Sequence, residues 1–358
     1  MIQRTDDEKT PKLAETEAVT TPIKDFEVLN AHETDLTGNI LRPSKLDQYI
    51  GQTRMVSQLK LILRSAAMRE TIPEHLLFYG QPGLGKTTIA TLIAGELGLD
   101  LKIIAAPSLK KVGDAVNVLI NLDQPSVVFI DEIHRLRTEV EETLYTAMED
   151  KKIDIMIGKG QGISTVRMDL QPFVLIGATT QFGKISKPLR DRFPTIFKME
   201  SYSMDEMLEL VERNVDILGI ELDRQAKILV CERSRGVPRI ANNILKRLVD
   251  LHTVHKTGEI NGTQALEFLT ELGILEKGLT KADLTYLKAL RSGSISLKTM
   301  GGVLSEETDT IEYAIEPYLI NLGFVDKDSS GRKLTLKGRT YIDTIVGQRS
   351  GDTGEEVL

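Results

Sequence analysis

Hydrophobic positions between Leu41 and about Tyr202 alternate between two patterns. Short, nearly all-apolar runs predict buried parallel strands at 76–79, 101–104, 127–130 and 173–177. Between them apolar residues recur at helical spacing, as at 54–68, where they share one face. The alternation from Leu41 to about Tyr202 therefore predicts an α/β domain built on a parallel sheet.

The pattern changes twice after residue 203. Helical stretches at about 205–218, 223–234, 238–256 and 263–270, with no strand signal, predict a small all-α domain, and Gly273–Gly278 resembles a linker. Two further helices follow from Lys281, and a third has apolar residues at helical spacing from Ile311 to Leu322. A turn at 328–331, between Phe324-Val325 and the stretch Lys333–Leu336, predicts a hairpin. Three helices and a hairpin are the layout of a winged helix.

The formal net charge of −7 lies in the two ends of the sequence. Residues 1–39 carry four basic and nine acidic side chains, and residues 350–358 carry three acids and no base, which leaves 40–349 at +1. We expect a disordered acidic extension at 1–39 and a tail at 347–358. The acidic total therefore does not argue against a nucleic-acid partner.

Composition excludes several classes of protein. With 41% hydrophobic and 27% charged residues it is ordinary for a globular chain, and no apolar run is long enough to span a bilayer. The single cysteine, Cys231, excludes an intrachain disulfide and a cysteine-based zinc site, and its apolar neighbours predict a buried thiol. We expect a cytoplasmic protein.

Residues 80–88 carry the strongest chemical signal. They form a glycine-rich G-x4-G-K-T turn between a predicted strand and a predicted helix. Backbone N–H groups in such a turn, together with the helix N-terminus, cradle a polyphosphate. Lys86 can reach the β- and γ-phosphates, and the Thr87 hydroxyl can bind Mg²⁺. The chain is expected to bind a nucleoside triphosphate.

Asp131 and Glu132 end the apolar run 127–130, 45 residues after Lys86. Ligands bind at the carboxyl ends of parallel strands, so Asp131 is expected to hold Mg²⁺ through water and Glu132 to activate the attacking water. Alone, such a pair could be a solvated turn. With His134 it also matches a D-E-x-H helicase box, but that motor needs a second motor domain, so His134 is assigned to the outer part of the site.

Three further polar residues are candidates for sensing the nucleotide. Thr180 follows the strand at 173–177 and is placed beside the γ-phosphate, although a threonine pair can simply end a strand. Arg192 lies two residues after Arg190; such arginines are usually solvated, but one can act in trans on a transferred phosphoryl group. Arg239 follows Pro238 at a helix start and is aimed back at the nucleotide.

Together these motifs resemble the RuvB family of AAA+ ATPases, bacterial Holliday-junction branch-migration motors, from about Leu41 to about Tyr341. The runs that carry the resemblance are Leu41–Pro43, Tyr49–Gln52, Pro82–Thr88, Phe129–Leu136, Ala147–Asp150, Leu175–Thr180, Leu189–Phe193 and Pro238–Asn242. The resemblance implies an AAA+ nucleotide-binding domain at 40–203, a lid at 204–276 and a winged-helix domain at 277–346. It also implies ATP and Mg²⁺ as cofactors, and a homohexameric ring on duplex DNA with RuvA and the junction resolvase RuvC as partners.

Roles follow from the same resemblance. Thr180 would be the first sensor, Arg192 the trans-acting finger and Arg239 the second sensor. A hairpin at 152–170 would project, with Val166 and Met168 docking RuvA, although both could be core residues. The nucleotide contacts implied are Leu41, Arg42, Gly83, Gly85, Lys86, Thr87, Thr88, Glu149, Asp150, Lys151, Tyr202 and Arg239.

The predicted wing is basic. Residues 327–339 carry five basic side chains and one acid, and Lys327 and Arg332 are the expected DNA contacts. The family has arginines where Lys327 and Ser330 stand, which bears on DNA affinity. The function predicted is an ATP-dependent DNA translocase that drives Holliday-junction branch migration. The alternative is a nucleotide-gated DNA-binding switch of the clamp-loader type.

Overall fold

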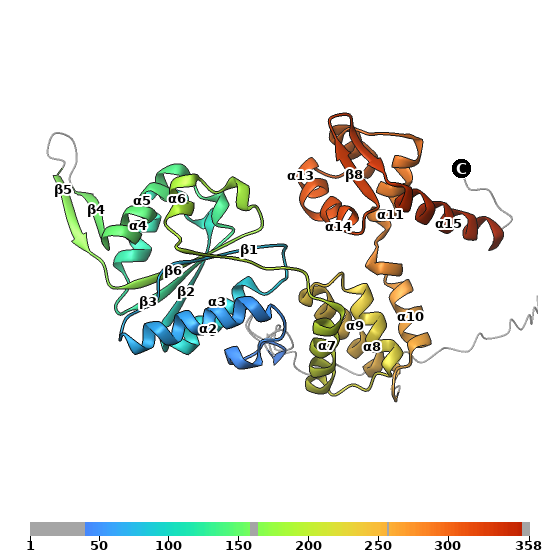
Figure 1. The fold of residues 1–358 in the computed structure, drawn as a ribbon, viewed down its shortest axis with the longest axis horizontal. Helices are drawn as coiled ribbons and strands as arrows, with labels where there is room; N and C mark the ends of the chain where they lie inside the picture. Colours follow the sequence, from blue (N-terminus) through green and yellow to red (C-terminus); the bar gives the residue numbers. More distant parts are fainter. Residues whose placement is uncertain (1–39, 158–163, 256–257, 353–358) are drawn as a thin grey trace, which may run out of the picture.

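The computed structural model describes residues 40–157, 164–255 and 258–352, arranged as three units (Figure 1). A sheet domain comes first, a helical lid follows, and a winged-helix domain lies beside the lid. This confirms the fold class predicted from the sequence. The predicted disorder of 1–39 lies outside the described residues.

The sheet domain is built on five parallel strands in the order β2-β3-β6-β1-β7. Four of them match the predicted strands, and the fifth, β7, was not predicted. Placing β1 between β6 and β7 brings the turn after β1 beside the carboxyl ends of β3 and β6. The strands are β1 (Leu76–Tyr79), β2 (Asp100–Ala105), β3 (Ser126–Asp131), β6 (Phe173–Thr179) and β7 (Thr195–Lys198).

Helices cover both faces of the sheet. Strand residues alternate between two cores: Phe129 packs in one and Val128 in the other, because successive strand side chains point to opposite faces. The strands read as continuous apolar runs since both faces are buried. The helices of this domain are η1 (Leu46–Gln48), α2 (Thr53–Met68), α3 (Lys86–Leu97), η2 (Ala106–Ser108), α4 (Val112–Ile120), η3 (Ile133–Arg135), α5 (Thr138–Asp150), η5 (Phe182–Lys184) and α6 (Lys187–Asp191).

A two-stranded hairpin projects from the sheet domain at the end far from the lid (Figure 1). It consists of β4 (Lys152–Ile157) and β5 (Ser164–Asp169), paired antiparallel. Arg167 makes a bidentate pair with Asp154 on one face. Val166 and Met168 lie on the other face and are each 40% exposed, so they are not core residues.

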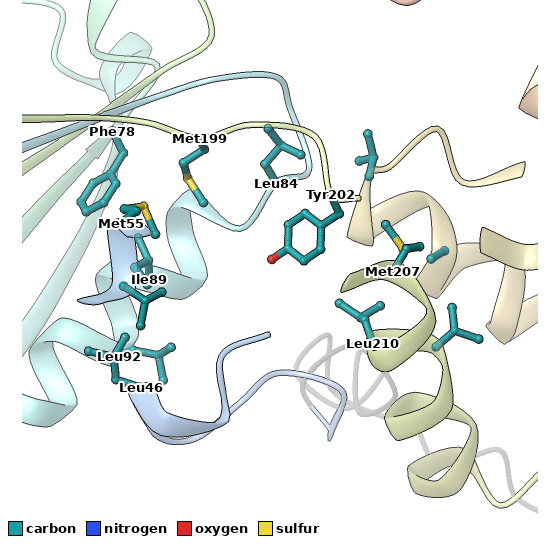
Figure 2. Close-up of a cluster of buried hydrophobic side chains, with 14 of the residues drawn as sticks. Leu46, Met55, Phe78, Leu84, Ile89, Leu92, Met199, Tyr202, Met207 and Leu210 are labelled. Carbon is teal, nitrogen blue, oxygen red and sulfur yellow. The ribbon is translucent and has the colours of Figure 1, made fainter. Parts of the chain in front are cut away.

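The lid shares one hydrophobic core with the sheet domain. Tyr202 lies between Leu84 of the sheet domain and Leu210 of the lid (Figure 2), and its side chain is 8% exposed. Cys231 is buried in this core, as predicted, and burial raises the pKa of its thiol to about 12. The lid helices are α7 (Met204–Leu218), α8 (Arg224–Arg233), α9 (Pro238–His255) and α10 (Gly262–Glu271).

The last unit has the predicted winged-helix layout with two differences. The third helix contains a π-helical turn, and a long helix follows the hairpin where no helix was predicted. That helix, α15, runs across the predicted boundary at 346/347. The elements are η6 (Glu276–Gly278), α11 (Lys281–Ala289), η7 (Leu290–Ser292), α12 (Leu297–Leu304), α13 (Thr308–Thr310), η8 (Ile311–Ile315), α14 (Glu316–Asn321), β8 (Val325–Asp328), β9 (Gly331–Leu334) and α15 (Leu336–Asp352).

Across the residues described, no helix combines the length and apolar character that crossing a membrane requires.

Candidate nucleotide-binding site

A cavity of about 400 Å³ lies between the sheet domain and the lid. Its walls come from the turn after β1, the start of α3, the end of β3 and the exposed side of α9. The lining residues are Arg42, Pro82, Gly83, Gly85, Lys86, Thr87, Thr88, Asp131, Glu132, Pro238, Arg239, Asn242, Asn243 and Lys246. Sequence motifs that are far apart along the chain therefore meet in one place.

Two glycines shape the turn. Gly83 has φ +85°, and a Cβ there would lie 2.8 Å from Val237 Cγ1 and 2.9 Å from Arg239 Cβ. Gly85 has φ +101°, and a Cβ there would lie 2.7 Å from the Tyr49 hydroxyl oxygen. Both positions need the left-handed backbone and the close approach that only glycine permits. The turn is thus a backbone-lined cradle pressed against the lid.

Lys86 is the first residue of α3 and is 7% exposed. Its ammonium donates to the carbonyl oxygens of Gly80 (2.8 Å) and Gln81 (2.9 Å). Burial lowers the pKa of Lys86, while the carboxylates of Glu132 and Asp131 act in the opposite direction. The lysine therefore brings a positive charge into a confined space at a helix N-terminus, which favours a polyanionic ligand.

Glu132 connects the end of β3 to the end of β6. It has φ +51°, and its Oε2 accepts hydrogen bonds from the Thr180 hydroxyl (3.0 Å) and the Thr180 amide (3.2 Å). His134 Nδ1 lies 3.2 Å from the same oxygen and 2.9 Å from Thr179 Oγ1. Burial lowers the pKa of His134, which favours the neutral imidazole at pH 7. The structure thus joins Thr180 to the carboxylate and places His134 behind it.

Thr87 and Asp131, the two residues expected to hold Mg²⁺, line the same cavity. No group of three or more histidine, cysteine, aspartate or glutamate side chains in the described residues could hold a metal ion. Mg²⁺ is bound through one or two protein groups plus water and phosphate, so a hydroxyl and one carboxylate fit it.

A second, smaller cavity adjoins the first and is lined by further residues that the resemblance implies as nucleotide contacts. Leu41 and Tyr202 line it, and Arg42, Gly85, Thr88, Pro238 and Asn242 line both cavities. Arg213 of the lid donates to the Leu41 carbonyl oxygen (3.4 Å), which ties this edge to α7. Neither Arg213 nor Tyr49 was singled out as a site residue, although Tyr49 donates to the Leu84 carbonyl oxygen (3.2 Å).

Asn242, Asn243 and Lys246 were also not predicted as site residues. With Arg239 they occupy positions i, i+3, i+4 and i+7 of α9, which is one helix face. Helical spacing from Arg239 was the signal that could have found them.

Arg192 and Glu149 do not line either cavity of their own chain. Arg192 Nη2 lies 2.6 Å from Glu149 Oε2, and its guanidinium lies 5.9 Å from the Tyr145 ring centroid. Asp150 and Lys151 follow Glu149 at the end of α5. The predicted finger and the predicted 149–151 contacts thus form one patch, separate from the phosphate cradle of the same chain.

The two predicted DNA contacts are held in an internal ion-pair cluster. Glu316, whose side chain is fully buried, accepts from Arg332 Nε (2.6 Å) and Tyr286 OH (2.9 Å), and lies 2.8 Å from Lys327 Nζ. Lys327 also pairs with Glu312 (3.1 Å). The third helix therefore supplies acids that neutralise part of the positive charge counted in the wing.

This fold and site define a P-loop ATPase of the AAA+ class with a helical lid and a winged helix. Three family models match consecutive parts of the chain: the Holliday junction DNA helicase RuvB P-loop domain over 41–199, the RuvB AAA lid domain over 202–274 and the RuvB C-terminal winged helix domain over 276–343. The chain belongs to the RuvB family.

Relatives agree with this assignment. The chain is 44% identical over 300 residues to the Holliday junction branch migration complex subunit RuvB of Campylobacter hominis, covering 83% of this chain and 88% of that protein. The solved Thermotoga maritima RuvB Holliday junction branch migration motor has a TM-score of 0.77 at 38% identity, covering 85% of this chain and 98% of that one. A Thermotoga maritima variant with one alanine replaced by serine has a TM-score of 0.78 at 39% identity and the same coverage.

Proposed function

We propose that this chain is an ATP-driven motor that moves duplex DNA during Holliday-junction branch migration, in recombination and DNA repair. The observation that carries the proposal is the shared cavity. Lys86 and Glu132 of the sheet domain face Arg239 of the lid across it, in a chain that matches RuvB models from 41 to 343. Hydrolysis at that junction would change how the two domains sit against each other.

The residues with predicted chemistry each have a role in the proposed reaction. The turn at 80–88 and Lys86 bind the phosphates, and Thr87 and Asp131 hold Mg²⁺, which neutralises phosphate charge when bound. Glu132 orients and activates the attacking water, and Thr180 positions Glu132 through its two hydrogen bonds. Arg239 contacts the nucleotide from the lid.

The patch at Arg192 suggests that the site is completed by a neighbouring subunit. Arg192 and residues 149–151 lie together and outside the cavity of their own chain. In a closed ring this patch would face the cavity of the next copy, which requires head-to-tail packing. We therefore propose a homohexamer in which Arg192 acts in trans. The bacterial cytoplasm is the location this role requires.

RuvA is the proposed partner at the projecting hairpin. Val166 and Met168 form an exposed apolar pair on one face of β5, and Arg167 pairs with Asp154 on the other. RuvC, which resolves junctions, is a further partner of the proposed complex. A clamp-loader type of switch is not favoured, because the C-terminal unit matches the winged-helix model of RuvB.

A junction-dissociation assay tests the function. A synthetic four-way junction with RuvA and this protein should separate into duplex arms with ATP, and should remain intact with a non-hydrolysable analogue. The Glu132→Gln variant is the matched control, because it keeps the shape of the site and removes the carboxylate. Activity that is equal with the analogue, or in Glu132→Gln, would overturn the motor and favour a nucleotide-gated switch.

A further inference from the structure

The turn between α8 and α9 has an unusual backbone at Arg235. Arg235 has φ +59° and Gly236 has φ +68°, so a non-glycine residue stands in the left-handed region next to a glycine. Residues with a Cβ adopt this conformation rarely, and it persists where the surrounding contacts determine it. The contacts of the Arg235 side chain all lie in the linker and the winged-helix domain.

Arg235 binds the linker and the winged-helix domain at three points. Its Nε donates to the Gly278 carbonyl oxygen (2.9 Å), and its Nη2 donates to Asp283 Oδ2 (2.5 Å). Its guanidinium lies 4.6 Å from the ring centroid of Tyr318, on α14. One side chain of the lid thus contacts the linker, the first helix and the third helix of the winged-helix domain.

The Arg235–Asp283 ion pair is shielded from water. The side chain of Arg235 is 14% exposed and that of Asp283 is 2% exposed. Asp283 Oδ2 also accepts from the Thr280 amide and the Thr280 hydroxyl, both at 2.7 Å. Removing one partner would leave a buried charge, so the geometry is strongly held.

The linker is also packed closely against the lid. Gly278 has φ +69°, and a Cβ at this position would lie 2.3 Å from the Arg233 carbonyl oxygen. Tyr318 OH donates to the Lys277 carbonyl oxygen (2.6 Å). The stretch predicted as a linker therefore has fixed contacts on both sides.

The same short turn touches the phosphate cradle at its other end. Arg239, four residues after Arg235, donates its backbone N–H to the Gly83 carbonyl oxygen (3.4 Å). The Val237 side chain fills the space over Gly83. A shift of the cradle relative to the lid would therefore move the segment that carries Arg235.

The helix that Arg235 contacts in the winged-helix domain is also bound to the wing. Tyr318 and Glu316 are both on α14, and Glu316 binds Arg332 and Lys327 of the hairpin. The third helix and the wing are thus held to each other by a buried carboxylate. Arg235 contacts Tyr318 on this same helix, so it joins the lid to the element that holds the wing.

We propose that Arg235 is a positioning residue that makes the lid and the winged-helix domain one rigid body, so that nucleotide-driven motion at Gly83 reaches the wing. The role in coupling rests on the proposed function. The rigid body formed by the lid and the winged-helix domain can be tested without a branch-migration assay. Arg235 does not touch the nucleotide cavity, which separates its role from that of Arg239.

Pairs of spin labels test the rigid body directly. Cysteines at three exposed positions, Met68 in the sheet domain (87% exposed), Leu266 in the lid (41%) and Leu336 in the winged-helix domain (84%), give the distances between domains. Cys231 is 3% exposed and should stay unlabelled. In the parent, we expect the Leu266–Leu336 distance to stay narrow with and without a non-hydrolysable ATP analogue.

The Arg235→Gln variant should broaden the Leu266–Leu336 distance distribution. Asp283→Asn, which keeps an acceptor for Thr280 but removes the charge opposite Arg235, should do the same. Arg247→Gln is the matched control, because Arg247 pairs with Asp250 on the surface of the same lid helix, at 2.9 Å. Unchanged distributions in both Arg235→Gln and Asp283→Asn would overturn the inference, whatever the activity of the parent.

Kinetics separate coupling from the chemistry of the site. In Arg235→Gln we expect the KM for ATP and the kcat without DNA to stay within about twofold of the parent, while stimulation of kcat by duplex DNA is lost. Arg235→Lys keeps the ion pair but not the two-point guanidinium contact, so it should restore part of the stimulation. If the kcat of Arg235→Gln without DNA fell by the same factor as its kcat with DNA, a positioning role would be contradicted. If the parent protein bound DNA but did not migrate junctions, the proposed motor function would be wrong. The spin-label distances would still test whether Arg235 holds the lid and the winged-helix domain together.

Discussion

At the scale of single residues, Arg192 has one ion-pair partner within its chain, and the proposed ring gives it a second across a subunit interface. Within the chain it pairs with Glu149 at 2.6 Å, with side chains 39% and 57% exposed, so the pair is weak and can exchange. A phosphate that is losing its bond to the leaving oxygen carries more negative charge than a solvated carboxylate. The pair therefore suits an arginine held ready for the next subunit.

Replacing Arg192 by alanine should leave ATP binding intact and reduce turnover by roughly 10³–10⁵-fold, the range measured for arginine fingers. ATP binding is measured with a fluorescent ATP analogue and turnover by phosphate release. Arg190→Ala is the matched control, because Arg190 lies two residues away over the Phe182 ring, 5.0 Å from its centroid. Turnover that survives in Arg192→Ala, or falls equally in both variants, would contradict the assignment.

The phosphate cradle offers a second test at single-residue scale. Gly83→Ala places a Cβ 2.8 Å from Val237 Cγ1 on a backbone with φ +85°, so nucleotide affinity should fall about tenfold or more. Gly95→Ala is the control within the same strand–turn–helix unit, since a Cβ there meets no atom within 4 Å and Gly95 lies inside α3. It should leave affinity unchanged and stabilise the chain by up to about 1 kcal/mol. Equal nucleotide affinities in Gly83→Ala and Gly95→Ala would contradict the assignment of the turn at 80–88 as the phosphate-binding site.

The cradle was predictable from sequence because its residues are contiguous and each has a fixed chemical task. Glu149 was harder to place, because only packing decides that the end of α5 lies beside the end of α6. The neighbours of Arg239 on α9 were predictable in principle from helical spacing. Tyr49 was not, since its contact with Leu84 joins residues 35 apart.

At the scale of elements, the buried carboxylate of Glu316 holds the hairpin of the wing to the third helix. Burial would by itself raise the pKa of Glu316, but hydrogen bonds from Arg332, Lys327 and Tyr286 outweigh it and lower the pKa below its usual range. A lowered folded-state pKa means that the ionised form stabilises the fold. That stabilisation is complete above the ordinary glutamate pKa and is lost as pH falls through the lowered value.

Glu316→Gln should destabilise the winged-helix domain by about 3–5 kcal/mol at pH 7, because Arg332 loses a buried partner. The difference from the parent should shrink as pH falls below about 4.5, the ordinary glutamate value at which the unfolded chain takes up a proton, and should vanish below the lowered pKa of the folded state. Thermal unfolding followed by calorimetry across a pH series measures it. Glu312→Gln, at a carboxylate 35% exposed, should cost about 1 kcal/mol or less. The stabilising role of the buried Glu316 carboxylate would be refuted if the two variants lost equal free energy of unfolding. It would also be refuted if the difference between Glu316→Gln and the parent did not change with pH.

The elements that were missed have physical reasons. Strand β7 is four residues long and two of them are exposed, so its pattern lacks the apolar run that revealed the other strands. Helix α15 has no clear apolar stripe along its length, and its start was assigned to the hairpin. The wing was counted as strongly basic because a sequence window excludes the acids of the third helix that fold against it.

At the scale of the whole molecule, the separation of Arg192 from its own cavity makes the proposed active site a property of two chains. In the proposed ring, the phosphate cradle, Glu132 and Arg239 would come from one copy, and the finger would come from the next. In a closed ring every copy would supply a cradle to its own site and a finger to the next. One inactive copy would therefore impair the movement of its neighbours as well as hydrolysis at its own site. This differs from a set of independent monomers, whose activities simply add.

Mixing parent protein with increasing fractions of Glu132→Gln should therefore reduce junction dissociation faster than in proportion to the parent fraction. The measurement is the rate of arm separation with RuvA at constant total protein. A mixture of parent with the double variant Glu132→Gln plus Arg192→Ala separates two effects, since that copy also withholds its finger and should reduce the rate further. As a dilution control, an unrelated inert protein should give a straight line. If the Glu132→Gln mixture also gave a straight line, the chains would act independently and the ring would be wrong, while the nucleotide site would still stand.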